Sequence, residues 1–325
     1  RLRHKAPPRR PRPEAARPCC NRRLSLPGIC RSDSGKVMNM KKSDPHAGDR
    51  EIRTTFGRIF MCGLAFCLLF SAIPAGVAAS EAILFPDANL EAVVRDELGI
   101  SEGDITDGDM TALRVLDADD KKISDLSGLE HAVNLRDLDL ESNQVNDLGP
   151  LANLTSLWKL DLESNQVSDL GPLANLTALR DLDLEDNQVS DLGPLANLTN
   201  LRNLDLEDNQ VSDLGPLANL TNLRNLDLED NQVGDLGPLV NLTSLRELGL
   251  ESNQVSDLGP LTNLTRLKKV DLEDNQVSDL SPLVDSELGR GVSVKLSHND
   301  LDLSSGSATT RDIEVLKERG VDVRY

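Results

Sequence analysis

A 22-residue motif repeats along most of this 325-residue chain and restricts what the chain can fold into. Near-identical copies follow one another without insertions, starting at Leu135, Leu157, Leu179, Leu201, Leu223, Leu245 and Leu267. A divergent copy precedes them at Leu113 and a truncated copy follows at Gly291, which makes nine turns. A fixed period of this size is typical of a solenoid, in which each copy buries its apolar side chains only against its neighbours.

The first half of each copy has the pattern of a short strand. In the copy that begins at Leu157, Leu160 and Leu162 alternate with Asp161 and Glu163. Alternating residues point to opposite faces of a strand, so we expect the leucines to point inward and the acids outward. Stacked copies then pair as a parallel sheet in which each layer contributes one side chain of each type.

The second half of each copy predicts a short return segment. Inward positions are expected at Val167, Leu170, Leu173 and Leu176 and at their equivalents. Pro172 suits the first position of a helical turn, and so short a segment favours 3₁₀ turns over full α-helices. Position 9 is Asn in seven copies, from Asn143 to Asn275, and we expect these amides to hydrogen-bond the backbone where the chain leaves the strand.

Both ends of the array have the pattern of a cap. Phe85, Pro86 and Asp87 precede an amphipathic helix that ends at Gly99, and its apolar positions are Leu90, Val93, Val94 and Leu98. At the other end, Ile313, Val315 and Leu316 lie in a helical run closed by Gly320, and Val321 and Val323 are compatible with a final strand. The sequence thus predicts an N-terminal cap at 80–112, nine turns at 113–303 and a C-terminal cap at 304–325.

The fold class that these patterns predict is an α/β solenoid. We expect a curved array with a parallel sheet on its concave face, short 3₁₀ or irregular segments on its convex side and a helical cap at each end.

The first 79 residues differ in character from the repeats. Residues 59–79 are apolar, follow several basic residues and end in small residues before Ser80, which indicates a secretory signal region at 38–79 with cleavage after Ala79. An uncleaved membrane anchor is the alternative that the 21-residue length allows.

Residues 1–37 are rich in Arg and Pro and contain no Met, so they are either a disordered basic arm or sequence upstream of a start at Met38 or Met40. We expect a secreted, extracellular or periplasmic monomer without a stable membrane anchor.

Composition excludes several classes of function. All five cysteines precede residue 80, so the repeats hold no disulfide, thiolate nucleophile or thiolate metal site. From residue 80 onward there are 19 Lys+Arg and 49 Asp+Glu, a balance that disfavours nucleic acid as a partner. His131 and His298 are the only histidines in this part, and we expect structural roles for both. No nucleophile–base pair, Gly-rich phosphate loop or calcium-loop motif interrupts the repeat, so we expect no catalytic residues, no cofactor and no specific metal site.

The repeat resembles that of a known family. The pattern L-x-x-L-x-L-x-x-N is the leucine-rich repeat signature. The run N-x-V-x-D-L-x-P-L-x-x-L-T at 187–199 resembles the 22-residue repeats of secreted bacterial proteins of the internalin type. The resemblance extends from Phe85 to Tyr325 and implies a leucine-rich repeat fold that binds other proteins through its concave face.

Two outward positions of the strand form acidic columns. Position 5 supplies Asp117, Asp139, Asp161, Asp183, Asp205, Asp227, Gly249 and Asp271, and position 7 supplies Asp119, Glu141, Glu163, Glu185, Glu207, Glu229, Glu251 and Glu273. Neighbouring strands lie about 4.8 Å apart, and like charges at that distance repel by roughly 0.9 kcal/mol even in water. Position 2 supplies basic residues that could compensate them, namely Arg114, Arg136, Arg180, Arg202, Arg224, Arg246 and Lys268. One basic residue per turn cannot balance two or three acids, so a surplus remains.

These columns lead to the functional prediction. We predict a secreted, non-enzymatic binding module that recognises a protein or another cationic surface through an acidic concave face. The predicted contact residues are Trp158, Asp161, Glu163, Asp183, Glu185, Asp205, Glu207, Asp227 and Glu229. Trp158 replaces the basic residue of its column and is either an apolar anchor or a neutral substitution. The alternatives are a solvated, internally compensated face, an extracellular enzyme and a structural protein that binds divalent cations.

Overall fold

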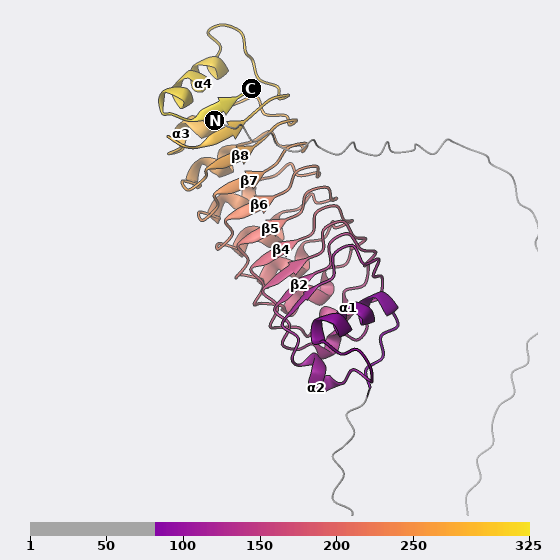
Figure 1. The fold of residues 1–325 in the computed structure, drawn as a ribbon. Coiled ribbons are helices and arrows are strands. Elements are labelled where there is room, and N and C mark those ends of the chain that lie inside the picture. The colour runs from indigo at the N-terminus through magenta and orange to yellow at the C-terminus, as the bar shows by residue number, and fades with distance from the viewer. Residues whose placement is uncertain (1–81) are drawn as a thin grey trace, which may run out of the picture. The chain divides into compact units, whose positions relative to one another are not determined.

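The computed structural model describes residues 82–325, which form one parallel sheet of ten strands arranged in chain order (Figure 1). The strands are β1 (Val115–Asp117), β2 (Asp137–Asp139), β3 (Lys159–Asp161), β4 (Asp181–Asp183), β5 (Asn203–Asp205), β6 (Asn225–Asp227), β7 (Glu247–Gly249), β8 (Lys269–Asp271), β9 (Ser293–Lys295) and β10 (Asp322–Arg324). Each strand pairs only with its neighbours along the chain. The sheet is therefore the stack of repeats that the 22-residue period predicts.

The strands pair without slippage. Leu160 of β3 lies opposite Leu182 of β4, which lies opposite Leu204 of β5. A slip of one residue would exchange inward leucines for outward acids, so burial of the leucines determines the register. Leu160 and Leu162 have no exposed surface, as the alternation predicts.

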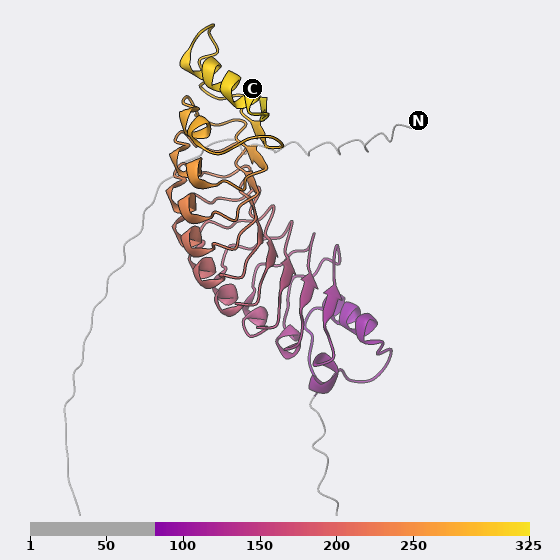
Figure 2. The ribbon, with the colours of Figure 1, turned by 90° about the vertical axis from the view of Figure 1, so that its left-hand side faces the viewer.

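Short turns return the chain from one strand to the next along the outer side of the bend, and the strands line its inner side (Figure 2). Seven of these segments are 3₁₀ turns: η1 (Leu129–His131), η2 (Gly149–Leu151), η3 (Gly171–Asn175), η4 (Gly193–Asn197), η5 (Gly215–Asn219), η6 (Gly237–Asn241) and η7 (Gly259–Asn263). From η2 onward, an Asp precedes each turn and holds its start: the Asp213 carboxylate accepts a hydrogen bond from the Gly215 N–H at 2.8 Å. The prediction of 3₁₀ turns is confirmed for these segments.

The last return segment differs from this prediction. It is a short α-helix, α3 (Ser281–Asp285), where the common Gly-Pro-Leu-Ala-Asn run becomes Ser-Pro-Leu-Val-Asp. The Val284 N–H reaches the Leu280 carbonyl at 3.2 Å, which is the i to i−4 bond of an α-helix. Departure from the consensus thus lets this turn lengthen.

Each position-9 asparagine connects two turns. The Asn209 amide donates to the carbonyls of Leu184 at 2.8 Å and Leu206 at 3.2 Å, and its oxygen accepts from the Val189 N–H at 2.8 Å. All seven predicted asparagines are 8–9% exposed and bond in this way. Asn299 continues the series beside β9. Their structural role is confirmed.

Helices cover both ends of the array. Helix α1 (Ala88–Leu98) begins after Asp87, whose carboxylate accepts from the Asn89 N–H, and ends at Gly99 in a left-handed conformation with φ 67°. Helix α2 (Asp107–Met110), which the sequence pattern did not indicate, follows within the N-terminal cap. Helix α4 (Ala308–Glu318) precedes β10, the final strand with which Val321 and Val323 are compatible.

Some sequence-based predictions fall outside the described residues. The interpretations of residues 1–37 and 38–79 belong to this group and stay predictions. No helix within residues 82–325 is both long and apolar enough to cross a membrane.

Candidate binding surface on the concave sheet face

The position-5 aspartates form a continuous column on the concave face of the sheet. Asp161, Asp183, Asp205 and Asp227 lie directly opposite one another on strands β3 to β6. The backbone of the same strand orients each of them, because the N–H of the residue two positions on donates to the carboxylate. The Glu185 N–H, for example, lies 3.1 Å from Asp183 Oδ1. The carboxylates are therefore fixed in a row.

The position-7 glutamates form a second column beside the first. Glu163, Glu185, Glu207 and Glu229 are all half-buried. The backbone ladder continues past the strand at this point, since the Asp186 N–H donates to the Glu207 carbonyl at 3.0 Å. The structure thus brings the eight predicted acidic residues together on one face.

The backbone conformation at position 8 explains why this position holds Asp or Ser. Asp186, Asp208 and Asp230 adopt left-handed conformations with φ of 50–52°, and Ser142 and Ser164 do so at φ 57° and 54°. Asp and Asn tolerate this conformation better than most side chains. The extra acids at this position thus serve the turn as well as adding charge.

Burial and crowding hold protons on these columns. Desolvation, followed by repulsion from Glu163 and Glu207, raises the pKa of Glu185 to about 8. Desolvation is likewise the largest cause that raises the pKa of Glu163, Glu207 and Glu229 to about 7 and of Asp205 to about 6. The pKa values of Asp161 and Asp183 are also raised, with desolvation first. The columns carry less than their formal charge at neutral pH.

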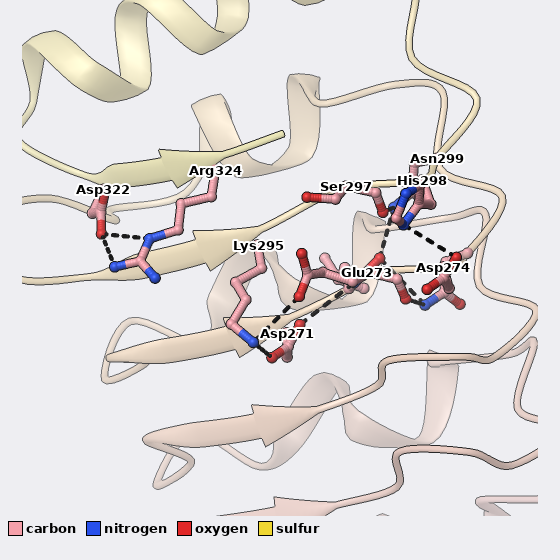
Figure 3. Close-up of polar contacts among 11 residues, drawn as sticks. Asp271, Glu273, Asp274, Lys295, Ser297, His298, Asn299, Asp322 and Arg324 are labelled. Carbon is pink, nitrogen blue, oxygen red and sulfur yellow. Dashed lines mark hydrogen bonds and ion pairs between the residues drawn. The ribbon is translucent and has the colours of Figure 1, made fainter. Parts of the chain in front are cut away.

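The aspartate column is interrupted at Gly249, and a lysine neutralises part of its charge near the C-terminal end of the array. Gly249 leaves a gap that the Asp227 carboxylate occupies, since a Cβ at Gly249 would overlap that group. Beyond the gap, Lys295 of β9 lies 2.5 Å from Asp271 and 3.3 Å from Glu273 (Figure 3). Lys295 was not predicted as a residue of this face, although its place between inward Val294 and Leu296 marks it as an outward residue.

A groove of about 560 Å³ runs along this face between positions 3 and 5. Trp158 lies at its edge and is 39% exposed. The position-3 residues from β3 to β8 are Lys159, Asp181, Asn203, Asn225, Glu247 and Lys269. These residues were not predicted as contact residues, although their variability in otherwise near-identical copies is a sequence signal that could have identified them.

Groups of three carboxylates on this face bring their oxygens within 4.8 Å of one another. One group is Asp161, Glu163 and Asp183, and two others are Asp183, Glu185 and Asp205 and Glu207, Asp227 and Glu229. Carboxylate oxygens are ligands for hard cations and acceptors for ammonium and guanidinium groups. The arrangement is therefore suited to positively charged groups.

The basic residues of position 2 form no ion pair with the acids in the part of the chain that the structure describes. Arg114 donates to the carbonyls of Thr111 and Leu113 instead. Among residues 82–325, none of the ion pairs involves a position-2 residue, and the closest basic neighbour of the central columns is Lys159, 3.6 Å from Asp161.

Both histidines of the described region lie away from the groove. His131 is the last residue of the first 3₁₀ turn, and its Nδ1 lies 2.5 Å from Asp107 of the cap. His298 is exposed beside β9, with its Nδ1 3.4 Å from Asp274. Each connects neighbouring segments, in agreement with a structural role.

Comparison with known proteins agrees with this architecture, which is that of a leucine-rich repeat solenoid. The family model described as Leucine Rich repeats (2 copies) matches residues 133–175, 155–197, 199–241 and 243–285.

Solved structures of similar fold include two internalins. The structure of internalin inlF from Listeria monocytogenes is 35% identical with a TM-score of 0.66, covering 70% of this chain and 69% of that one. Internalin C2 from the same organism is 37% identical with a TM-score of 0.62, covering 69% of this chain and 100% of that one. A leucine-rich repeat protein of Leptospira interrogans is 21% identical with a TM-score of 0.53, covers 66% of this chain and 62% of that one, and supports the fold alone. The comparison with curated proteins finds no match.

The chain therefore belongs to the internalin-type family of bacterial leucine-rich repeat proteins. An internalin-like leucine-rich repeat fold indicates a protein-binding module.

Proposed function

We propose that this protein is a secreted, non-enzymatic binding module whose concave sheet face recognises a positively charged protein. The proposed contact residues are Asp161, Glu163, Asp183, Glu185, Asp205, Glu207, Asp227 and Glu229, with Trp158 as an apolar anchor. The observation that carries the proposal is the in-register aspartate column along a groove, with the glutamate column beside it.

The physical support is the mutual repulsion within the columns. Desolvation and neighbouring carboxylates both raise the pKa values of these acids, which means that their ionised forms are unfavourable in the free protein. Lys or Arg side chains of a partner would relieve that repulsion. A row of charge in a concavity also attracts an oppositely charged partner from a distance and accelerates association.

An enzymatic alternative has little support in the same region. Hydrolytic catalysis by side chains needs a nucleophile beside a base, or a comparable constellation in a pocket. The two histidines within residues 82–325 lie at opposite ends of the array and pair with Asp107 and Asp274. The secreted location rests on the signal pattern of residues 59–79.

The first prediction tests the columns with a ten-residue oligolysine as probe. We expect the triple variant Asp183→Asn, Asp205→Asn and Asp227→Asn to bind oligolysine about tenfold more weakly at low salt, because three central charges are lost. Binding to the parent should also weaken steeply between 0.1 and 1 M salt, as the Debye length falls from about 10 Å to about 3 Å. Fluorescence anisotropy measures both effects.

A matched control lies on the convex side of the same turns. Asp191, Asp213 and Asp235 each accept a hydrogen bond from a glycine N–H, and Asn in their place keeps an acceptor oxygen while removing the same three charges. This control should bind oligolysine nearly as well as the parent. Equal weakening of both triple variants would show that only net charge matters and would remove the concave columns from the proposal.

A further inference from the structure

Four arginines from consecutive turns lie along the N-terminal margin of the sheet. We call this set the Arg strip, and it consists of Arg180, Arg202, Arg224 and Arg246. The backbone ladder fixes their spacing. The Arg202 N–H donates to the Arg180 carbonyl at 2.8 Å, and the Arg224 N–H donates to the Arg202 carbonyl at 2.8 Å. The strip thus presents one guanidinium per strand, about every 4.8 Å.

The guanidinium groups of the Arg strip have no partner among residues 82–325. None of them appears in the ion pairs of that region, and none donates a side-chain hydrogen bond there. All four side chains are exposed. Each guanidinium therefore offers five N–H donors to a ligand.

The centre of the strip lies beside amides rather than acids. At position 3, next to Arg202 and Arg224, the chain has Asn203 and Asn225. The Asn225 amide donates to the Asn203 oxygen at 2.8 Å, and Asn203 donates in turn to the carboxylate of Asp181. The acids at position 3, Asp181 and Glu247, therefore lie beside the two end arginines, and the two central arginines have amides as their position-3 neighbours.

A second hollow of about 350 Å³ lies along the strip. It is lined by the four arginines, the two asparagines and Trp158, and by two acids, Asp181 and Glu247, which follow the first and last arginines of the strip. The aspartate column begins three residues further along each strand, which corresponds to about 10 Å. This distance exceeds the Debye length of about 8 Å at physiological salt, so the acidic columns do not cancel the local field of the strip.

We propose that the Arg strip binds carboxylates of an acidic peptide segment. This inference rests on the proposed function in one respect: the same partner protein would place basic groups over the acidic columns and acidic groups over the Arg strip. Guanidinium forks bind carboxylates with two parallel hydrogen bonds. Acidic side chains three or four residues apart on one helix face lie about 5–6 Å apart, close to the spacing of the strip.

The test uses a fluorescent ten-residue oligoglutamate as probe and the double variant Arg202→Gln, Arg224→Gln. The matched control is Arg290→Gln, Arg311→Gln, which removes the same charge from exposed sites near the C-terminal cap. We expect the strip variant to lose about tenfold in oligoglutamate affinity and the control to lose little, because the contact is local. Oligolysine affinity of the strip variant should stay equal or rise. Melting temperatures of both variants should match the parent, since the side chains that they change are exposed.

Other outcomes would overturn the inference. Absence of oligoglutamate binding to the parent, or equal losses in the strip variant and the control, would show that the Arg strip is a solvated margin. Binding of oligogalacturonate without binding of oligoglutamate would assign the strip to an acidic sugar chain instead. Failure of the proposed function would give a different result. In that case the triple variant Asp183→Asn, Asp205→Asn and Asp227→Asn would bind oligolysine as well as the parent does.

Discussion

At the scale of single residues, one asparagine per turn is required by the backbone. Asn209 accepts from the Val189 N–H and donates to the Leu184 carbonyl of the preceding turn, a carbonyl that Asn187 also reaches at 3.2 Å. We expect Asn209→Ala to lower the free energy of unfolding by about 3 kcal/mol, because buried backbone groups lose their partners. Urea denaturation measures the change. The neighbouring exposed Gln210→Ala is the control and should change it by less than about 0.5 kcal/mol.

A second residue-scale prediction concerns Glu185, whose pKa is raised to about 8 from an ordinary value of 4.5. Between about pH 4.5 and pH 8, Glu185 keeps its proton in the folded protein and releases it in the unfolded chain. Its contribution to the free energy of unfolding is therefore complete below about pH 4.5 and is lost as the pH rises toward 8. We expect Glu185→Gln to exceed the parent in stability at pH 8.5 by about 1 kcal/mol, allowing for solvent screening, and to differ less at pH 5. Urea denaturation at both values measures this.

The exposed Glu287→Gln serves as the control for charge removal alone. If both variants change stability equally at the two pH values, crowding in the glutamate column is not the source of the pH dependence. A parent whose stability rises from pH 5 to pH 8.5 would contradict the raised pKa values of the column as a group.

At the scale of elements, each copy contacts only the copies on either side. Deletion of residues 201–222 removes β5 and η5 and joins two copies with nearly the same sequence at the junction. Val189 can then pair with Asn231 as it does with Asn209, so both new interfaces repeat existing ones. We expect a folded protein with one strand fewer and a cooperative urea transition, observed by circular dichroism. Loss of folding would show that contacts beyond nearest neighbours hold the array together.

The elements were predictable from the sequence to the extent that the repeat is regular. The alternation of Leu160 and Leu162 with acids determines both the strand and its inward face, because the core admits leucine and excludes carboxylates. Helix α3 was not predicted, since its turn departs from the common sequence and a longer hydrogen-bond pattern forms there. Helix α2 was also missed, although Thr106 and Asp109 form a capping box at its start.

The candidate surface was predictable only in part. The period places Asp183 and Asp205 in one column, so their adjacency follows from the sequence. What the sequence does not contain is which flexible side chains pair with each other. Compensation of these acids by Arg202 was one of the open alternatives, and Arg202 lines the hollow at the other margin of the face and forms no ion pair within the described part of the chain.

At the scale of the whole molecule, the concave face has two differently charged margins. The Arg strip follows the N-terminal ends of the strands and the glutamate column follows their C-terminal ends. The face is fixed by a ten-stranded ladder, so a partner meets both margins in one orientation. Charge pattern, rather than net charge, then determines how the partner is oriented on the sheet.

The last prediction follows from the protons that the acidic columns hold. Ammonium groups placed over Glu185, Glu207 and Glu229 would lower pKa values that now stand at about 7 to 8, so binding must release protons at neutral pH. We expect oligolysine to release about one to two protons at pH 7 and its affinity to rise from pH 6 to pH 8.5. Calorimetry in buffers of different ionisation enthalpy measures the number. The double variant Glu185→Gln, Glu207→Gln should release fewer protons than the parent, whereas oligolysine binding without proton release would mean that the probe does not contact the glutamate column.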